Sequence, residues 1–234
     1  GKTNSLAPGG TPGDTGGTPV LPFPCSMDSA PLIQFHNTSG TPTPGTLTRL
    51  SPHELVRAAR FHFEHDRHRW INGRAWVRQQ LGSVLGLTPE AVEIAAEPGG
   101  RLYVPGAALD FNLSHTGGWI ALGICQGGRL GVDLETIDPT FPALEIASEF
   151  FLPAERDWIA AGPVERFFHL WTAKEALMKA TGRGMSLPPD KIHVSINDGT
   201  PSTVTNLETG ETHSVTTRPG PGSTILATVH LPAT

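Results

Sequence analysis

The sequence predicts an α+β fold made of two halves of one chain. Helical patterns are followed by short strands, and the same order recurs in the second part of the chain, without a strict sequence repeat. The 234 residues, 38% of them hydrophobic, suffice for one large domain or two small ones with a shared core. We therefore expect residues 49–130 and 131–234 to form two α+β halves, preceded by a segment of different composition, residues 1–48.

That N-terminal segment is rich in Gly, Pro, Thr and Ser and is nearly free of charges. It can bury too little apolar surface to fold alone, so we expect it to be extended, with short strands at 20–23 and 32–35. A signal-peptide pattern and a run of about 18 apolar residues are both missing from the sequence. The two cysteines, Cys25 and Cys125, lie in unrelated contexts, and we expect free thiols in a cytoplasmic protein.

The first half should begin with two helices. Ser51-Pro52-His53-Glu54 is typical of a capping box with proline at the first helical position, and predicts a helix to about residue 63. A second helix is expected from about 66 to 85, where Gly86 and Pro89 end it. If the helices were continuous, four arginines would share one face: Arg60, Arg67, Arg74 and Arg78.

The remaining elements follow from period and turn residues. The glycine pair in Gln126-Gly127-Gly128 predicts a tight turn, and hence an antiparallel hairpin between the strands on either side of it. The expected strands are 92–95, 111–114, 119–125, 130–135, 191–196, 213–217 and 224–231. The expected helices are 142–151, 153–161 and 163–181, the last one strongly amphipathic.

Two carboxylates alternate on one predicted strand, Gly131-Val132-Asp133-Leu134-Glu135. Since successive strand residues point to opposite faces, Asp133 and Glu135 should project together, away from the leucines and Val132. Like charges on one strand face cost stability unless a cation lies between them. The alternative is a solvated polar face of a half-exposed strand.

The amphipathic helix adds a third carboxylate, because Glu175 and Lys179 lie one turn apart. An ordinary surface ion pair is the alternative, but the helix is otherwise very apolar. Next to the strand carboxylates, Glu175 would complete an oxygen-ligand site suited to Mg²⁺, and Lys179 could contact a phosphate. The turn after Ser114 and His115 could bind an anion or could be a plain hairpin turn.

The distribution of charge points to a small anionic ligand. The formal net charge is −5, which argues against bulk attraction to nucleic acid. Six arginines nevertheless fall between Arg57 and Arg78, opposed within those bounds only by Glu64 and Asp66.

Taken together, the motifs resemble those of 4′-phosphopantetheinyl transferases. Gly131-Val132-Asp133-Leu134-Glu135 and, about 40 residues later, Trp171-Thr172-Ala173-Lys174-Glu175-Ala176-Leu177-Met178-Lys179 are similar to the two family signatures. Phe111-Asn112-Leu113-Ser114-His115-Thr116-Gly117 resembles the upstream histidine motif, and Gly182-Arg183-Gly184-Met185-Ser186-Leu187 the glycine-rich stretch after the second signature. Gly100-Arg101-Leu102-Tyr103 resembles the segment near the adenine, with Arg101-Leu102 in place of Lys-Pro.

The resemblance implies a site and a chemistry. Asp133, Glu135 and Glu175 would bind Mg²⁺ or Mn²⁺, with Glu175, Lys179 and Asp133 as the catalytic residues. Glu175, or a water that it holds, would be the base for the carrier serine. The contacts to coenzyme A implied by the resemblance are Arg57, Arg69, Gly100, Arg101, Ser114, His115, Lys174 and Lys179.

The length matches the large, pseudo-dimeric single-chain type that activates surfactin synthetase, rather than the short trimeric type. We therefore expect a monomer whose active site lies in the cleft between the halves. The reaction implied is transfer of phosphopantetheine from coenzyme A to a serine of an apo acyl or peptidyl carrier protein, with no nucleic acid or membrane as partner. The sequence does not distinguish polyketide, nonribosomal-peptide and fatty-acid carriers.

Two other classes of function compete with this one. The chain could bind coenzyme A or a carrier without turnover, but the four residues needed for turnover are all present: Asp133, Glu135, Glu175 and Lys179. It could also be another Mg²⁺-dependent phosphotransferase or hydrolase, yet the sequence contains no P-loop, G-x-S-x-G or H-E-x-x-H motif.

Overall fold

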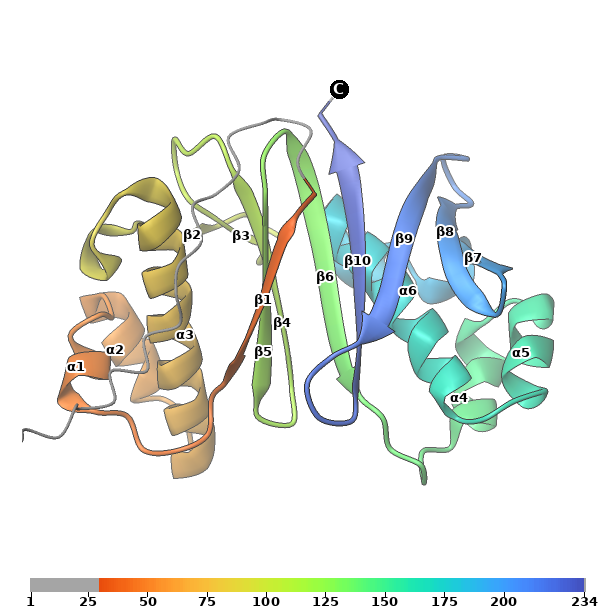
Figure 1. Ribbon diagram of the computed structural model, residues 1–234, viewed down its shortest axis with the longest axis horizontal. Coiled ribbons are helices and arrows are strands. Elements are labelled where there is room, and N and C mark those ends of the chain that lie inside the picture. The colour runs from red at the N-terminus through yellow and green to blue at the C-terminus, as the bar shows by residue number, and fades with distance from the viewer. Residues whose placement is uncertain (1–29, 234) are drawn as a thin grey trace, which may run out of the picture.

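A computed structural model describes residues 30–233, in which two antiparallel sheets stand side by side with helices at the outer ends (Figure 1). The first sheet has the strand order β1-β5-β4, the second β6-β10-β9-β8-β7, and β2-β3 is a small separate pair. The strands are β1 Leu32–Asn37, β2 Ala95–Ala96, β3 Leu102–Tyr103, β4 Asp110–Thr116, β5 Trp119–Cys125, β6 Gly128–Thr136, β7 Ile192–Asn197, β8 Thr200–Asn206, β9 Thr212–Pro219 and β10 Thr224–Pro232. The helices are α1 Pro44–Leu47, α2 Pro52–Ala58, α3 Glu64–Leu85, α4 Ala143–Phe150, α5 Pro153–Ala160 and α6 Glu165–Thr181. Three single-turn 3₁₀ helices complete the list: η1 Pro89–Ala91, η2 Gly184–Ser186 and η3 Pro189–Lys191.

The predicted capping box at the start of α2 is present. The Ser51 hydroxyl accepts a hydrogen bond from the Glu54 backbone N–H at 3.3 Å, and the Glu54 carboxylate accepts one from the Ser51 N–H at 2.9 Å. The expectation that this helix continues to residue 63 is wrong, because α2 ends at Ala58, which is buried against α3. That packing requires the chain to turn back, so the four arginines do not share one face of a continuous helix.

The expected hairpin between β5 and β6 is also wrong. β5 lies between β1 and β4, so both of its edges already carry partners, and β6 pairs instead with β10. The glycine turn, with φ 70° at Gly127 and 150° at Gly128, carries the chain from one sheet to the next. Of the strand expected at 92–95 only Ala95 lies in a strand, the two-residue β2, and β3 and β8 were not predicted.

The two sheets meet along a seam between β4 and β6 that side chains bridge. Three alternate β4 side chains accept hydrogen bonds from β6 backbone N–H groups: Asp110 from Leu130 at 2.6 Å, Asn112 from Val132 at 2.8 Å, and Thr116 from Thr136 at 3.2 Å. An apolar cluster from both sheets lies beside this seam: Ala121, Cys125, Leu130, Val132, Leu134 and Leu226. The seam therefore satisfies amides of the β6 edge that would otherwise lack partners.

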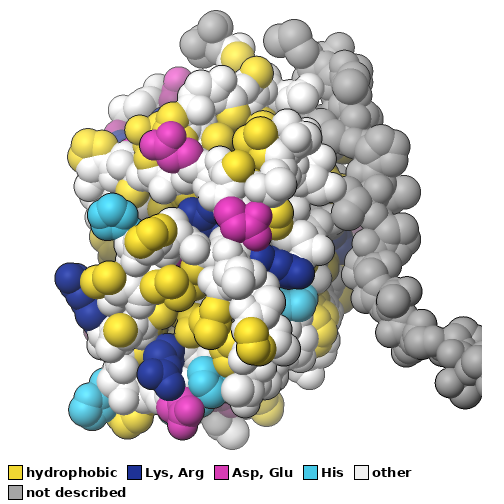
Figure 2. All heavy atoms as spheres, turned by 90° about the vertical axis from the view of Figure 1, so that its left-hand side faces the viewer, with side chains coloured by type: hydrophobic (Ala, Val, Ile, Leu, Met, Phe, Trp, Pro, Cys, Tyr) yellow, Lys and Arg dark blue, Asp and Glu magenta, His cyan; other side chains and the backbone are white. Residues whose placement is uncertain are grey.

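Each sheet has its own long helix and core. Val77 and Leu81 of α3 pack on β5, whereas Leu170, Leu177 and neighbouring residues of α6 pack on the strands of the second sheet. Figure 2 shows the end covered by α1–α3, where hydrophobic, basic and histidine side chains lie next to one another. In the described part of the chain no helix is long and apolar enough to cross a membrane. The strand expected at 20–23 and Cys25 fall outside the described residues.

Candidate active site

Asp133 and Lys179 meet where the two halves join. The Lys179 ammonium lies 2.7 Å from Asp133 Oδ1, and it also donates to the Ser114 hydroxyl at 3.0 Å. The Ser114 hydroxyl in turn donates to Asp133 Oδ1 at 3.0 Å. One residue of the first half, on β4, therefore shares a buried polar cluster with two residues of the second, on β6 and α6.

The two other predicted carboxylates lie close enough to affect this cluster electrostatically. Burial, with the nearby charges of Asp133 and Glu175, raises the pKa of Glu135 to about 7, although Lys179 opposes the shift. Burial and Asp133 likewise raise the pKa of Glu175. Three carboxylates that disfavour one another's charge, with one ammonium among them, make a site that favours an added cation.

The three carboxylates are suitable ligands for a divalent cation, but they are not arranged as a complete coordination shell. Within residues 30–233, no three Asp, Glu, His or Cys side chains converge closely enough to be a ready-made metal site. Asp133 Oδ2 is nevertheless buried and has no hydrogen-bond partner among the described residues, and carboxylate oxygens are the ligands that Mg²⁺ prefers. Small rotamer changes move a carboxylate oxygen by about an ångström, so the unpartnered Asp133 oxygen and the neighbouring Glu135 and Glu175 fit a divalent cation.

Gly131 explains why α6 can approach β6 so closely. A Cβ atom at Gly131 would lie 1.7 Å from the Ala176 carbonyl oxygen, so only glycine fits there. The Gly131-Val132-Asp133-Leu134-Glu135 strand alternates as predicted, with Leu130, Val132 and Leu134 buried on one face. Asp133 and Glu135 are thus on the face that looks to α6.

A pocket of about 280 Å³ opens beside the Lys179 side of the cluster. The first half contributes residues of the β2–β3 turn and of β4, and the second half residues around the end of α6. The lining consists of Gly99, Gly100, Arg101, Leu102, Phe111, Asn112, Leu113, Met178, Lys179, Gly182 and Gly184. A small ligand bound here would contact both halves.

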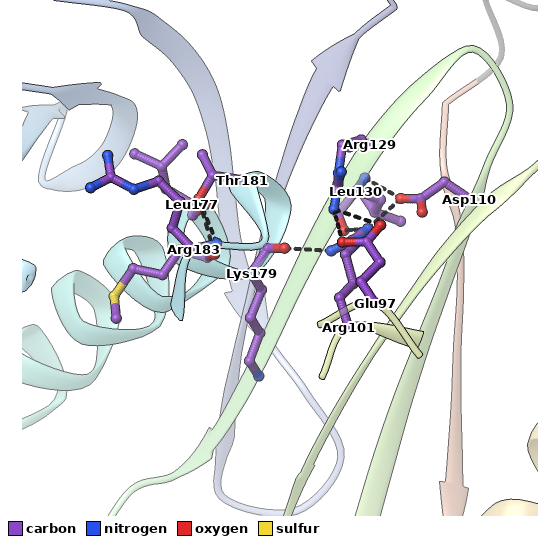
Figure 3. A network of polar contacts seen from close by, with 10 residues as sticks. Glu97, Arg101, Asp110, Arg129, Leu130, Leu177, Lys179, Thr181 and Arg183 are labelled. Atoms are coloured by element: carbon purple, nitrogen blue, oxygen red, sulfur yellow. Dashed lines mark hydrogen bonds and ion pairs between the residues drawn. The ribbon is translucent and has the colours of Figure 1, made fainter. Parts of the chain in front are cut away.

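The buried Arg101 side chain lies at this pocket and connects residues of both halves through hydrogen bonds (Figure 3). Its guanidinium donates to the backbone carbonyl of Lys179, to the Leu130 carbonyl at 2.8 Å, and to Asp110 at 2.5 Å. Figure 3 shows the Lys179 side chain pointing away from this network while its carbonyl faces Arg101. The Arg101 charge is therefore already paired, whereas its neighbour Gly100, in a left-handed turn with φ 84°, is exposed at the pocket.

Lys174 is not at the site, although the sequence suggested a contact with coenzyme A. It is fully buried in the second half, 2.7 Å from Glu155, and it donates to two backbone carbonyls. Burial lowers the pKa of Lys174, and Glu155 opposes that shift. An ammonium whose three protons are all donated inside the core cannot reach a ligand, so the expected contact between Lys174 and coenzyme A is wrong.

The remaining candidates are exposed and lie outside the pocket lining. Arg57 on α2 rests over the Trp70 ring at 5.5 Å, and Arg69 is exposed on α3. His115 on β4 is exposed, on the strand face opposite to Ser114. Asp110 and Glu155 were not predicted from the sequence. The place of each residue in its element is visible in the sequence: Asp110 begins a strand, and Glu155 is the third residue of a helix that starts with proline.

Comparison with known proteins gives the same family for both halves. Residues 42–126 match the family described as "4'-phosphopantetheinyl transferase, N-terminal", and residues 129–229 match the "4'-phosphopantetheinyl transferase superfamily". The chain belongs to this superfamily.

Its relatives place it with the Sfp-like members. It is 34% identical to the 4′-phosphopantetheinyl transferase HetI of Nostoc sp., over 71% of this chain and 72% of the relative. It is 32% identical to the 4′-phosphopantetheinyl transferase Sfp of Bacillus subtilis, over 70% and 73%. Another 4′-phosphopantetheinyl transferase of Bacillus subtilis is 31% identical, over 65% and 69%.

Proposed function

We propose that this chain transfers 4′-phosphopantetheine from coenzyme A to a serine of an apo acyl or peptidyl carrier protein. The observation that carries the proposal is the cluster of Asp133, Glu135, Glu175 and Lys179 beside a pocket lined by both halves. A diphosphate is a ligand that such a cluster can hold together with a cation, and the family relationship supports the same reaction.

The chain's own residues would bind, orient and move a proton. In the reaction the serine oxygen bonds to the phosphorus that carries pantetheine, the bond from that phosphorus to the bridging oxygen breaks, and 3′,5′-ADP leaves. Lys179 neutralises phosphate charge, and Glu175, or a water it holds, accepts the serine proton. Asp133, Glu135 and Glu175 would hold Mg²⁺ or Mn²⁺, which when bound would offset charge on the diphosphate.

The first half would recognise the nucleotide end of coenzyme A. Arg57, Arg69 and His115 would pair with the 3′-phosphate, and Ser114 would contribute a hydroxyl beside Lys179. The turn at Gly100 would contact the adenine through its backbone, since the Arg101 charge is occupied. We further propose that the protein works as a cytoplasmic monomer, with the division between the halves at residues 130 and 131.

Intact-protein mass spectrometry tests the reaction. Apo acyl and peptidyl carriers are incubated with the protein, coenzyme A and Mg²⁺, with parallel samples lacking coenzyme A or containing EDTA. We expect a mass gain of one phosphopantetheine group in the complete mixture alone. If coenzyme A binds but no carrier of the panel gains mass, the chain is a binding module; a gain that persists in EDTA refutes the metal assignment.

A further inference from the structure

Each half contains a buried ion pair built from the same parts. A glutamate stands third in a helix that begins with proline, Glu54 in α2 and Glu155 in α5. Each glutamate accepts a hydrogen bond at 2.9 Å from the backbone N–H of the residue before that proline. Each also pairs with a cation of the long helix that follows, Arg78 on α3 at 2.6 Å and Lys174 on α6 at 2.7 Å. Glu54 has a second, longer contact with Arg74 of α3 at 3.3 Å.

The two cations also make matching backbone contacts. Arg78 donates to the carbonyls of Pro89 and Val92, at 2.9 and 2.7 Å, which are the first residue of η1 and the residue after its end. Lys174 donates to Pro189 and Ile192, at 2.9 and 2.7 Å, which hold the same two positions in η3. We call Glu54 with Arg78 the first clamp, and Glu155 with Lys174 the second clamp. Agreement in four separate contacts shows that one device occurs twice, although the sequence has no strict repeat.

The second clamp is the more deeply buried of the two. The side chains of Glu155 and Lys174 are 1% and 0% exposed, against 13% and 4% for Glu54 and Arg78. Glu155 accepts a further hydrogen bond from the Val194 N–H at 2.8 Å. The three Lys174 protons have three acceptors: Glu155, Pro189 and Ile192. A buried pair satisfied in this way tolerates little displacement, because any movement leaves a polar group without its partner.

The second clamp lies directly beside the active-site residues of α6. Lys174 fixes one side of the helix to α5 and η3, and two residues later the Ala176 carbonyl lies against Gly131 of β6. Glu175 stands between these two fixed neighbours, and Lys179 follows one turn later on the same face. Because Lys174 and Ala176 are both held in place, the orientation of α6 about its own axis is fixed.

We propose that Lys174 is a positioning residue, which, through Glu155, holds α6 in the rotation that brings Glu175 and Lys179 to Asp133. The inference rests on the proposed function of that site. It assigns to the second clamp a role in turnover that the first clamp does not have, since Arg78 is followed in the chain by Gln79 and Lys174 by Glu175.

The test compares Lys174→Met with Arg78→Met, since each removes the cation of one clamp and keeps an unbranched apolar stem. Both should unfold at a lower temperature than wild type. Below that temperature, Lys174→Met should lose about 10- to 100-fold in kcat with little change in KM for coenzyme A, because its catalytic groups are misplaced. Arg78→Met should keep its kcat. Lys174→Arg should recover most of the loss, since arginine makes the same contacts in the first clamp.

A second readout does not depend on turnover. The rise in unfolding temperature on addition of Mg²⁺ should shrink in Lys174→Met and persist in Arg78→Met. If the folded Lys174→Met protein has the kcat and the Mg²⁺ response of wild type, or if Arg78→Met loses as much of both, the positioning role is refuted. Should Lys174→Met fail to fold, Glu155→Gln replaces it, with the same expectations at smaller size. A wild-type protein that modifies no carrier refutes the proposed function alone, because the Mg²⁺ response still tests the clamp.

Discussion

The two halves share an arrangement of an edge strand and a long helix, but they carry different charges at corresponding places. β1 lies at one edge of the first sheet and pairs with β5, as β6 lies at one edge of the second and pairs with β10. On the face toward the long helix, β6 carries Asp133 and Glu135, whereas β1 carries Gln34 and His36. His36 stacks on Trp76 of α3 at 5.2 Å, and burial lowers its pKa, which favours the neutral ring.

The long helices differ in the same way. If Arg78 and Lys174 are superposed as equivalent cations, Gln79 occupies the place of Glu175, and Ser83 that of Lys179. Gln79 accepts a hydrogen bond from Arg49 at 2.7 Å and so serves the packing of the first half. The shared arrangement of strands and helices therefore does not by itself make a site. The second half supplies the carboxylates, and the first half supplies Ser114 and one wall of the pocket.

The largest effect should come from truncating Asp133 on β6, and the matched control is Gln34 at the corresponding place on β1. Asp133→Ala should lower kcat by about 10³-fold or more, because it removes both a proposed metal ligand and the partner of Lys179. Folding should survive, since the Lys179 side chain is 28% exposed and can be solvated. Gln34→Ala, the same truncation on β1, should leave transfer unchanged. If the two variants have comparable activity at saturating Mg²⁺, Asp133 is not a metal ligand.

Breaking the seam should cost stability more than any exposed pair. Arg101→Met removes the buried donor that Asp110 and two carbonyls share, although Asp110 keeps the Leu130 N–H and the Lys179 carbonyl keeps the Gly182 N–H. We expect a loss of about 3 kcal/mol or more in the free energy of unfolding, measured in urea. Arg129→Met is the matched control. Its pair with Glu97 is 41% and 35% exposed and should contribute about 1 kcal/mol or less. Equal losses in the two variants would show that Arg101 does not hold the halves together.

The arginines of the first half test whether that half recognises the nucleotide. Charge-assisted contacts contribute about 1.5–3 kcal/mol each, so Arg57→Ala or Arg69→Ala should raise KM for coenzyme A by about one to two orders of magnitude. Wild type should prefer coenzyme A over 3′-dephospho-coenzyme A, and the variants should lose most of that preference. Arg60→Ala, also exposed, is the control. If the preference for coenzyme A survives in both variants, the 3′-phosphate binds elsewhere on the protein.

The smallest expected effect is on stability without metal. Because the folded-state pKa of Glu135 is about 7 rather than 4.5, the folded chain holds that proton longer than the unfolded chain. In EDTA, the free energy of unfolding should therefore fall as pH rises from about 4.5 to 7. Glu135→Gln removes this cost and should melt a few degrees above wild type at pH 8, with little difference near pH 4.5.

The exposed Glu149→Gln on α4 serves as the control and should follow wild type. Adding Mg²⁺ at pH 8 should raise the melting temperature of wild type more than that of Glu135→Gln. If the two proteins respond equally, Glu135 is not part of a metal site.

Local patterns predicted most helices and strands of the described chain. Ser51, Pro52 and Glu54 gave the start of α2, Gly86 the end of α3, and the residues of β5 were predicted without error. These features depend on neighbours in the chain, such as caps and alternation. The predictions that failed, the length of α2 and the β5–β6 hairpin, depended on what packs beside those segments.

The sequence by itself determined the family, the alternation that puts Asp133 and Glu135 on one strand face, and the one-turn spacing of Glu175 and Lys179. Strand and helix periods alone fix such relations, because they are short-range. Tertiary structure decided which charges are free to meet a ligand. Lys174 and Glu175 are adjacent in the chain, yet one is held by three acceptors inside the core and the other faces Asp133. Arg101 likewise became an internal tie, because the seam placed two carbonyls and Asp110 around it. Burial and long-range partners set the role of a charge, and neither can be read from its neighbours in sequence.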